Sequence, residues 1–179
     1  MQIITSGPDT NEPHIRNNYL ELFHKAKHHI YIQTPYFIPD DAILSALKIA
    51  ALSGVDVRLM IPCKPDHPFV YRATQYYARV LANHDITIYF YENGFLHAKT
   101  IMIDGRMASV GSANLDFRSF KLNFEINSFI YDRNMTDKLE QIFVNDIRSS
   151  RVITPEMFAN QSRWLRFKQT FSRLLSPIL

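Results

Sequence analysis

The stretch HAKTIMIDGRMASVGSAN, residues 97–114, decides the expected fold because it predicts a β-hairpin. Apolar and polar side chains alternate on both sides of Asp104-Gly105, a dipeptide typical of a two-residue hairpin turn. With those two residues in the turn, Ile103 is expected to face Arg106. Continued outward, the same register places His97 opposite Ser112, so their side chains share one face of the hairpin.

The predicted hairpin gathers groups that suit phosphate chemistry. A period of two places Lys99 on the face of His97, and Asn114 on the face of Ser112. An imidazole attacks phosphorus or protonates a leaving alcohol, while ammonium, hydroxyl and amide donors neutralise phosphate oxygens. Glu125, in the strand expected to follow, is the candidate acceptor that orients His97 through its other ring nitrogen.

Other motif positions have a structural and a functional interpretation. Asp104 belongs to the motif, but an Asp in an Asp-Gly turn bonds nearby backbone, which favours a structural role. Tyr36 and Phe37 either pack at a strand end or line a substrate pocket at the carboxyl ends of parallel strands. Arg118 either anchors the loop after the hairpin, within the DFRS segment 116–119, or lines that pocket. Four further histidines are interpreted as solvated or structural: His28, His29, His67 and His84.

The rest of the chain predicts alternating strands and helices. Apolar runs predict strands at residues 3–5, 30–34, 55–61, 86–91 and 124–131, and helical periodicity appears at 14–28, 42–52, 68–81 and 135–150. Short connections favour strands that run in parallel. The expected class is therefore α/β: a mixed, largely parallel β-sheet with helices on both faces and the hairpin towards its C-terminal end, in one domain spanning residues 1–179.

A basic amphipathic helix is predicted at about residues 155–176. Its apolar residues recur at three- and four-residue steps: Trp164, Phe167, Phe171, Leu174, Leu175 and Ile178. Basic residues occupy intervening positions: Arg163, Arg166, Lys168 and Arg173. Two placements stay open. The apolar stripe packs on the domain's own core, as in most such helices, or it lies in the headgroup layer of an anionic membrane.

Composition excludes several classes of protein. The chain of 179 residues is 46% hydrophobic, which is enough for one core, and its formal charge of +3 suits phosphate-bearing partners. Its single cysteine, Cys63, allows no intrachain disulfide, and neither the cysteine nor the histidines show the spacing of a metal site. No metal or other cofactor is expected. The sequence contains neither a membrane-spanning apolar stretch nor a signal peptide, so the chain as given is expected to be soluble or peripheral.

The string HxKxxxxD at residues 97–104, followed by GSxN at 111–114, resembles the signature of the phospholipase D superfamily. The flanks GFLHAKT, ASVGSANLDFRSF, LNFE and TPYFIPD, with the ending RLLSPIL, resemble the C-terminal half of bacterial cardiolipin synthases. The resemblance implies a phospholipase D-like fold and a metal-independent transfer through a phosphohistidine. It also implies that two such histidine (HKD) motifs meet in one site, and this chain has one of them.

The resemblance further implies a phosphatidyltransferase half-domain that helps to join two phosphatidylglycerols into cardiolipin and glycerol. The second motif would come from an N-terminal HKD half of the same protein or from a homodimer partner. His97 is assigned as general acid, with the nucleophile in the other half. Anionic phospholipid and a membrane surface are the expected partners, nucleic acid is not, and the full-length protein is expected at the bacterial cell membrane. A homodimeric phospholipase D-type nuclease or phosphodiesterase, and a noncatalytic lipid-binding module, are the alternatives.

Overall fold

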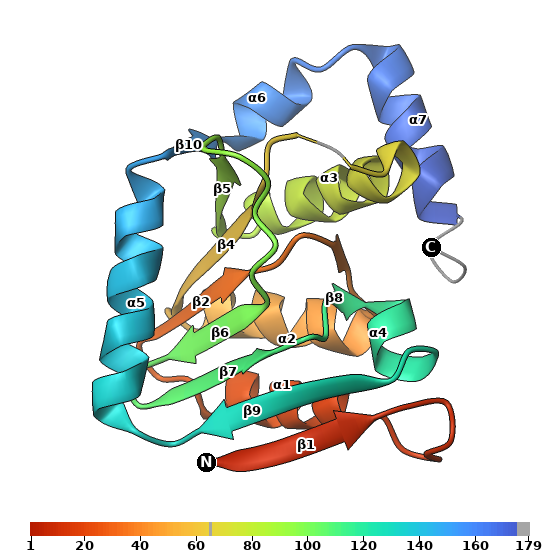
Figure 1. The fold of residues 1–179 in the computed structure, drawn as a ribbon. Helices are drawn as coiled ribbons and strands as arrows, with labels where there is room; N and C mark the ends of the chain where they lie inside the picture. Colours follow the sequence, from red (N-terminus) through yellow and green to blue (C-terminus); the bar gives the residue numbers. More distant parts are fainter. Residues whose placement is uncertain (65, 175–179) are drawn as a thin grey trace.

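A computed structural model describes residues 1–64 and 66–174, and an eight-stranded sheet forms its centre (Figure 1). The strands lie in the order β1-β9-β7-β6-β2-β4-β5-β10. Their bounds are Gln2–Ser6 for β1, Glu125–Ile130 for β9, Met107–Gly111 for β7, Thr100–Ile103 for β6, His29–Gln33 for β2, Asp56–Pro62 for β4, Thr87–Tyr91 for β5 and Ser150–Ile153 for β10. A small second sheet pairs β3, Phe37–Ile38, with β8, Leu115–Asp116.

Helices cover both faces of the large sheet, as predicted. Helices α1 (His14–Lys25), α2 (Asp41–Leu52) and α3 (Pro68–Ala82) lie on one face, and α5 (Arg133–Ile147) lies on the other (Figure 1). The short helix α4 spans Phe117–Lys121. No helix in the described part of the chain is long and apolar enough to cross a membrane. The α/β class with a mixed sheet is therefore confirmed.

The prediction that the sheet is largely parallel was wrong. Within the described part of the large sheet, only β2 with β4 and β4 with β5 pair in parallel, and its other neighbouring strands are antiparallel. The parallel pairs are those joined by the crossover helices α2 and α3. Strand β1 instead pairs with β9, and the hairpin β6–β7 joins the sheet with reversed strands, so both add antiparallel pairs.

The hairpin forms at Asp104-Gly105, but its register differs from the expected one. Asp104 and Gly105 have φ of 55° and 61°, and the Arg106 N–H donates to the Ile103 carbonyl at 3.0 Å, as in a two-residue turn. Ile103 nevertheless pairs with Met107, so Arg106 belongs to the loop as well. The pairing is shifted by one residue. The inference that His97 faces Ser112 was therefore wrong.

The predicted C-terminal helix is divided into two shorter helices, α6 (Pro155–Ala159) and α7 (Arg163–Leu174). Asn160 caps the end of α6, and the Ser162 hydroxyl accepts from the backbone N–H of Leu165 at 3.2 Å, which begins a new helix. The apolar stripe of α7 does not pack on the core. Trp164, Phe167, Phe171 and Leu174 are all exposed, so packing on the core, one of the two placements left open, does not hold for these four residues. Leu175 and Ile178 lie outside the described residues.

Candidate active site

The predicted site residues, apart from Asp104 and Phe37, come together at one end of the large sheet. Strands β2, β4 and β5 end there, the antiparallel strands β6 and β9 begin there, and β7 ends there. His97 and Lys99 lie in the loop before β6, and Ser112 and Asn114 directly follow β7. Glu125 is the first residue of β9. The fold therefore gathers polar side chains from segments that are distant in sequence.

His97 and Lys99 lie at the surface of this end. The His97 side chain is exposed, and its ring lies 5.9 Å from the ring of Phe95 between centroids. Lys99 is partly buried and donates from Nζ to the carbonyl of His97 at 2.8 Å. Burial lowers the pKa of the Lys99 ammonium, and the carboxylates of Glu125 and Asp116 oppose this shift. An accessible imidazole and a partly desolvated cation thus lie on one short loop.

Ser112 and Glu125 bond to each other across the paired ends of β7 and β9. The Ser112 hydroxyl donates to Oε2 of Glu125 and accepts from the backbone N–H of Ile126 at 3.0 Å. The other carboxylate oxygen, Oε1, accepts from the Asn123 side chain at 3.2 Å. Glu125 therefore fixes the Ser112 hydroxyl beside Lys99. Its expected hydrogen bond to His97 stays a prediction.

The Asn114 side chain contacts the buried carboxyl group of Asp116. Its Oδ1 atom is buried and, among the described residues, has no hydrogen-bond partner, although its backbone N–H donates to the Ser119 hydroxyl at 3.1 Å. Burial raises the pKa of the Asp116 carboxyl, opposed by hydrogen bonds from Ser119 and Asn114. Asp116 also accepts from the Ser119 N–H at 2.7 Å and so caps α4. The Asn114 oxygen is therefore a buried acceptor that no described residue satisfies.

A cavity of about 380 Å³ opens beside these residues. Tyr36, at the carboxyl end of β2, lines it, and its hydroxyl donates to Asp66. Burial and the Asp66 carboxylate raise the pKa of Tyr36. Arg118 lines the same cavity from the first turn of α4. Its complete lining is Tyr36, His67, Pro68, Phe69, Val70, Asn114, Asp116, Arg118 and Asn123.

Phe37 does not belong to the cavity. Its side chain is fully buried in the main core, and its backbone N–H donates to the Thr74 hydroxyl at 3.1 Å. The substrate-pocket role considered for Phe37 is thus corrected, because β3 turns this ring inward while Tyr36 faces the cavity. Packing at a strand end was the right interpretation of Phe37.

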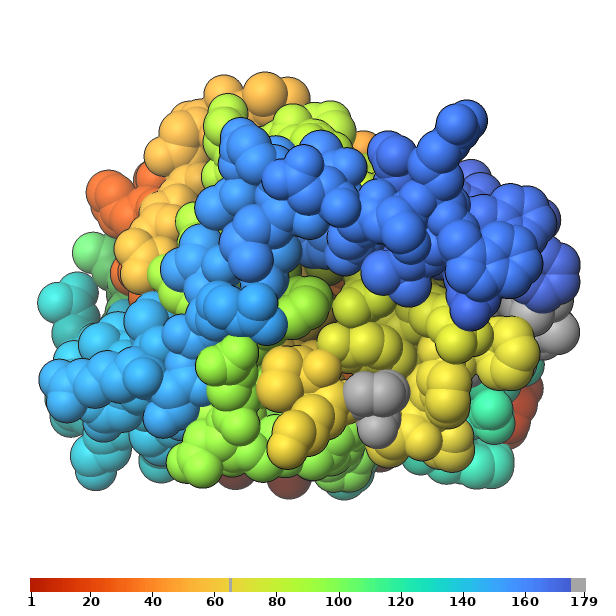
Figure 2. Space-filling view, turned by 90° about the horizontal axis from the view of Figure 1, so that it is seen from above, coloured from red at the N-terminus to blue at the C-terminus, as the bar shows by residue number. Residues whose placement is uncertain are grey.

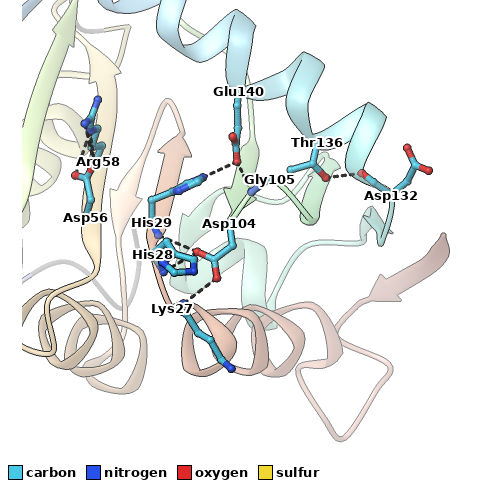
Figure 3. Close-up of polar contacts among 10 residues, drawn as sticks. All are labelled: Lys27, His28, His29, Asp56, Arg58, Asp104, Gly105, Asp132, Thr136 and Glu140. Carbon is cyan, nitrogen blue, oxygen red and sulfur yellow. Dashed lines mark hydrogen bonds and ion pairs between the residues drawn. The ribbon is translucent and has the colours of Figure 1, made fainter.

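Asp104 lies at the opposite end of β6 from His97, and Figure 3 shows its carboxylate turned towards the start of β2. It accepts backbone N–H groups of Lys27, His28 and His29 at 2.8, 2.9 and 2.8 Å. Burial would raise the pKa of Asp104, but these three donors outweigh it and lower the pKa. The contacts favour the structural role over a catalytic one.

Sequence reasoning missed three residues around the cavity. His67 was interpreted as solvated or structural, yet it lines the cavity, as does Asn123. Asp66 bonds Tyr36 from the loop that follows β4. For Asp66 and His67 the available signal was position, because residues that follow a parallel strand lie at the same edge as Tyr36. Asn123 follows α4 and had no such signal. Nothing in the spacing distinguished them from ordinary loop residues.

The fold is shared with a phospholipase D family member. Nuc from Salmonella typhimurium has a TM-score of 0.74 at 21% identity over 86% of this chain and 97% of its own. The phosphatidylserine synthase of Haemophilus influenzae has a TM-score of 0.76 at 17% identity, over 99% of this chain and 47% of its own. At these identities the likeness concerns the fold. The fold of this chain is therefore phospholipase D-like.

Sequence comparisons make the assignment more specific. The family model described as cardiolipin synthase, PLD-like domain, matches residues 19–147, and the chain belongs to this family. The chain is 58% identical over its whole length to a cardiolipin synthase of Listeria welshimeri and 54% identical to the major cardiolipin synthase of Bacillus subtilis. It spans 37% of the length of each of these two relatives.

Proposed function

We propose that this chain supplies one histidine motif to a phosphatidyltransferase that joins two phosphatidylglycerols into cardiolipin and releases glycerol. The observation that carries the proposal is the exposed His97 ring on the same short loop as the partly desolvated Lys99, at the end of the sheet where Asn114 lines a cavity. The high identity to cardiolipin synthases supports this choice of substrate. We refer to the active assembly, with two such motifs, as the two-motif enzyme.

The proposed reaction has two displacements at phosphorus. A histidine of the second motif attacks the phosphodiester of the first phosphatidylglycerol, and the bond to its head-group glycerol breaks. His97, protonated, gives its proton to the departing glycerol oxygen. The neutral ring then takes the proton from a primary hydroxyl of the second phosphatidylglycerol. That oxygen attacks the phosphohistidine, releases the histidine and forms cardiolipin.

The surrounding groups are assigned to the phosphate oxygens. Lys99 supplies a positive charge, and Ser112 and Asn114 supply hydroxyl and amide donors. The Ser112 hydroxyl turns its single proton from Glu125 to the phosphate when the substrate binds. Glu125 is proposed to position Ser112 and to balance the charge of Lys99, on the basis of its hydrogen bond to the hydroxyl. Orientation of His97 by Glu125 also belongs to this proposal, because closure of the site by a second half would change the surroundings of the exposed ring. No cofactor takes part in these steps.

The second motif is proposed to come from another part of the same protein or from a second copy of the chain. The substrate is a membrane lipid, so the working site of the enzyme is proposed to be the bacterial cell membrane. A phosphohistidine trapped on His97 itself would reverse the assigned roles of the two histidines without changing the reaction.

A substrate panel tests the proposal. Purified two-motif enzyme is incubated with phosphatidylglycerol vesicles, and separately with single- and double-stranded DNA, in the presence of a chelator. Cardiolipin formation from the vesicles, with DNA left intact, is the expected result. DNA cleavage without any cardiolipin would instead favour the phosphodiesterase alternative. Binding of phosphatidylglycerol without turnover of either substrate would favour a noncatalytic lipid-binding module.

A further inference from the structure

Helix α7 packs against the domain through its polar face. Gln169 and Ser172 are its buried residues, and the helix packs against α3; in Figure 2 the dark-blue atoms of α7 adjoin the yellow atoms of α3. The Gln169 side chain donates to Gln75 of α3 at 3.2 Å and accepts from Arg79 of α3 at 3.3 Å. Arg173 lies over the ring of Tyr76, 5.2 Å from its centroid. These polar contacts determine the orientation of the helix.

The orientation leaves the apolar stripe of α7 exposed to solvent. Trp164, Phe167, Phe171 and Leu174 are 64%, 60%, 50% and 68% exposed. Burial of the Gln169 amide requires hydrogen-bond partners, and Gln75 and Arg79 of α3 supply them. The polar face of α7 is therefore the face that fits the domain. The stripe is therefore presented outward by the fold, and an exposed apolar face of this kind marks an interaction site.

The charge on α7 has one sign. The helix carries Arg163, Arg166, Lys168 and Arg173, and neither Asp nor Glu occurs between Arg163 and Leu174. Trp164 and Phe167 stack with their centroids 5.6 Å apart, and the Lys168 ammonium lies 5.0 Å from the Trp164 centroid. Aromatic rings flanked by cations match the interface of an anionic bilayer, where rings enter the boundary and cations meet phosphates.

A cleft between α3 and α7 adds a second feature of this surface. Its volume is about 270 Å³, and it is lined by Phe69, Arg72, Trp164, Phe167, Lys168, Phe171 and Ser172. Its lining combines four aromatic rings with two cations, a combination that suits an amphiphile with an apolar chain and a phosphate. Phe69 also lines the cavity of the candidate site. The aromatic surface therefore reaches the mouth of that cavity.

We propose that the exposed face of α7, with the start of α3, docks onto the interface of an anionic phospholipid bilayer and turns the mouth of the candidate site towards the membrane. The cleft accepts the upper part of a lipid chain, and Arg72 and Lys168 contact its phosphate. The choice of an anionic lipid rests on the proposed function. The contact surface itself follows from the orientation of α7, so docking and turnover are tested separately.

The test compares vesicle binding of the 179-residue chain with that of two double variants. Trp164→Ser with Phe167→Ser removes two exposed rings of the stripe. Ile49→Ser with Leu52→Ser is the matched control, because these side chains on α2 are 58% and 72% exposed. Cosedimentation uses vesicles of phosphatidylglycerol with phosphatidylcholine, and vesicles of phosphatidylcholine alone. Melting temperatures of all three proteins establish that they are folded.

The α7 variant is expected to bind anionic vesicles at least about tenfold more weakly, with an unchanged melting temperature, while the α2 variant binds like the parent chain. Charge reversal, Arg163→Glu with Arg166→Glu, should also weaken binding to anionic vesicles. Equal binding by the α7 and α2 variants would overturn the proposal. So would self-association of the parent chain that is lost in the α7 variant, without vesicle binding. Because no turnover is measured, failure here leaves the proposed reaction standing.

Discussion

Replacing Asp104 should destabilise the fold without removing a catalytic group. Its carboxylate accepts three backbone N–H groups, those of Lys27, His28 and His29 (Figure 3). The adjacent Gly105 N–H donates to Glu140 at 2.9 Å, and Glu140 also contacts the His29 ring at 2.7 Å. The turn thereby joins the hairpin, the start of β2 and helix α5, so the loss of one carboxylate affects three elements.

The loss of stability expected on replacing Asp104 depends on how exposed its hydrogen-bond donors are. A hydrogen bond to a charged group contributes about 1.5–3 kcal/mol, but water can replace the carboxylate at the exposed residues Lys27 and His28. Asp104→Ala should therefore lower the free energy of unfolding by about 3 kcal/mol, including strain of alanine at positive φ, or Tm by roughly 6–12 °C. Asparagine adopts that positive φ readily and keeps one acceptor oxygen. Asp104→Asn should therefore lower the free energy of unfolding by only about 1 kcal/mol.

The stabilisation by Asp104 should depend on pH. Because the folded pKa is lowered, the contribution is fully present above the ordinary carboxyl pKa of about 3.9 and is lost as pH falls through the folded value. Urea unfolding of the parent chain and Asp104→Asn should differ at pH 7 and converge in acid. Arg106→Ala, an exposed position in the same turn, is the control. Equal stability of Asp104→Ala and the parent chain at pH 7 would refute the reasoning.

Three further outcomes are expected. His97→Ala should lower the turnover of the two-motif enzyme at least about 10²-fold with unchanged Tm, and activity above one tenth of the parent would contradict a proton-transfer role. Gly111→Ala should lower the free energy of unfolding by about 2 kcal/mol or more, because a Cβ there would lie 2.3 Å from the Ile126 carbonyl oxygen; unchanged urea unfolding would show that this contact relaxes freely. If copies of this chain complete the site, the dilute-range rate should rise with the square of protein concentration, and strict linearity would refute that arrangement.

The local features of the fold were predictable from sequence, and its long-range pairings were not. Apolar periodicity located the helices and strands around the core, and Asp104-Gly105 located the turn. The register was missed because nothing in the sequence shows that Arg106 joins the loop. The position of β1 was also missed, since its partner β9 lies more than a hundred residues away and local pattern carries no information on that contact.

The candidate site was predicted in its motif residues and only partly in its surroundings. The polar residues of the hairpin do lie at one end of the sheet. His97 does not face Ser112 as predicted, because the strand pairing is shifted by one residue. His67 was missed because cavity walls form from loops that have no periodicity. Periodicity also revealed that α7 has two faces but not which one is buried. That depended on Gln75 and Arg79 of another helix, which supply partners for Gln169.

The central claim is that His97 serves phosphatidyl transfer between two lipids. Its most direct test is quantification of cardiolipin, glycerol and phosphatidic acid formed from phosphatidylglycerol vesicles by the two-motif enzyme, with His97→Ala measured in parallel. Transfer predicts one glycerol released for each cardiolipin formed, little phosphatidic acid, and loss of all products in the variant. Phosphatidic acid and glycerol without cardiolipin, or cardiolipin formation undiminished in His97→Ala, would contradict the account.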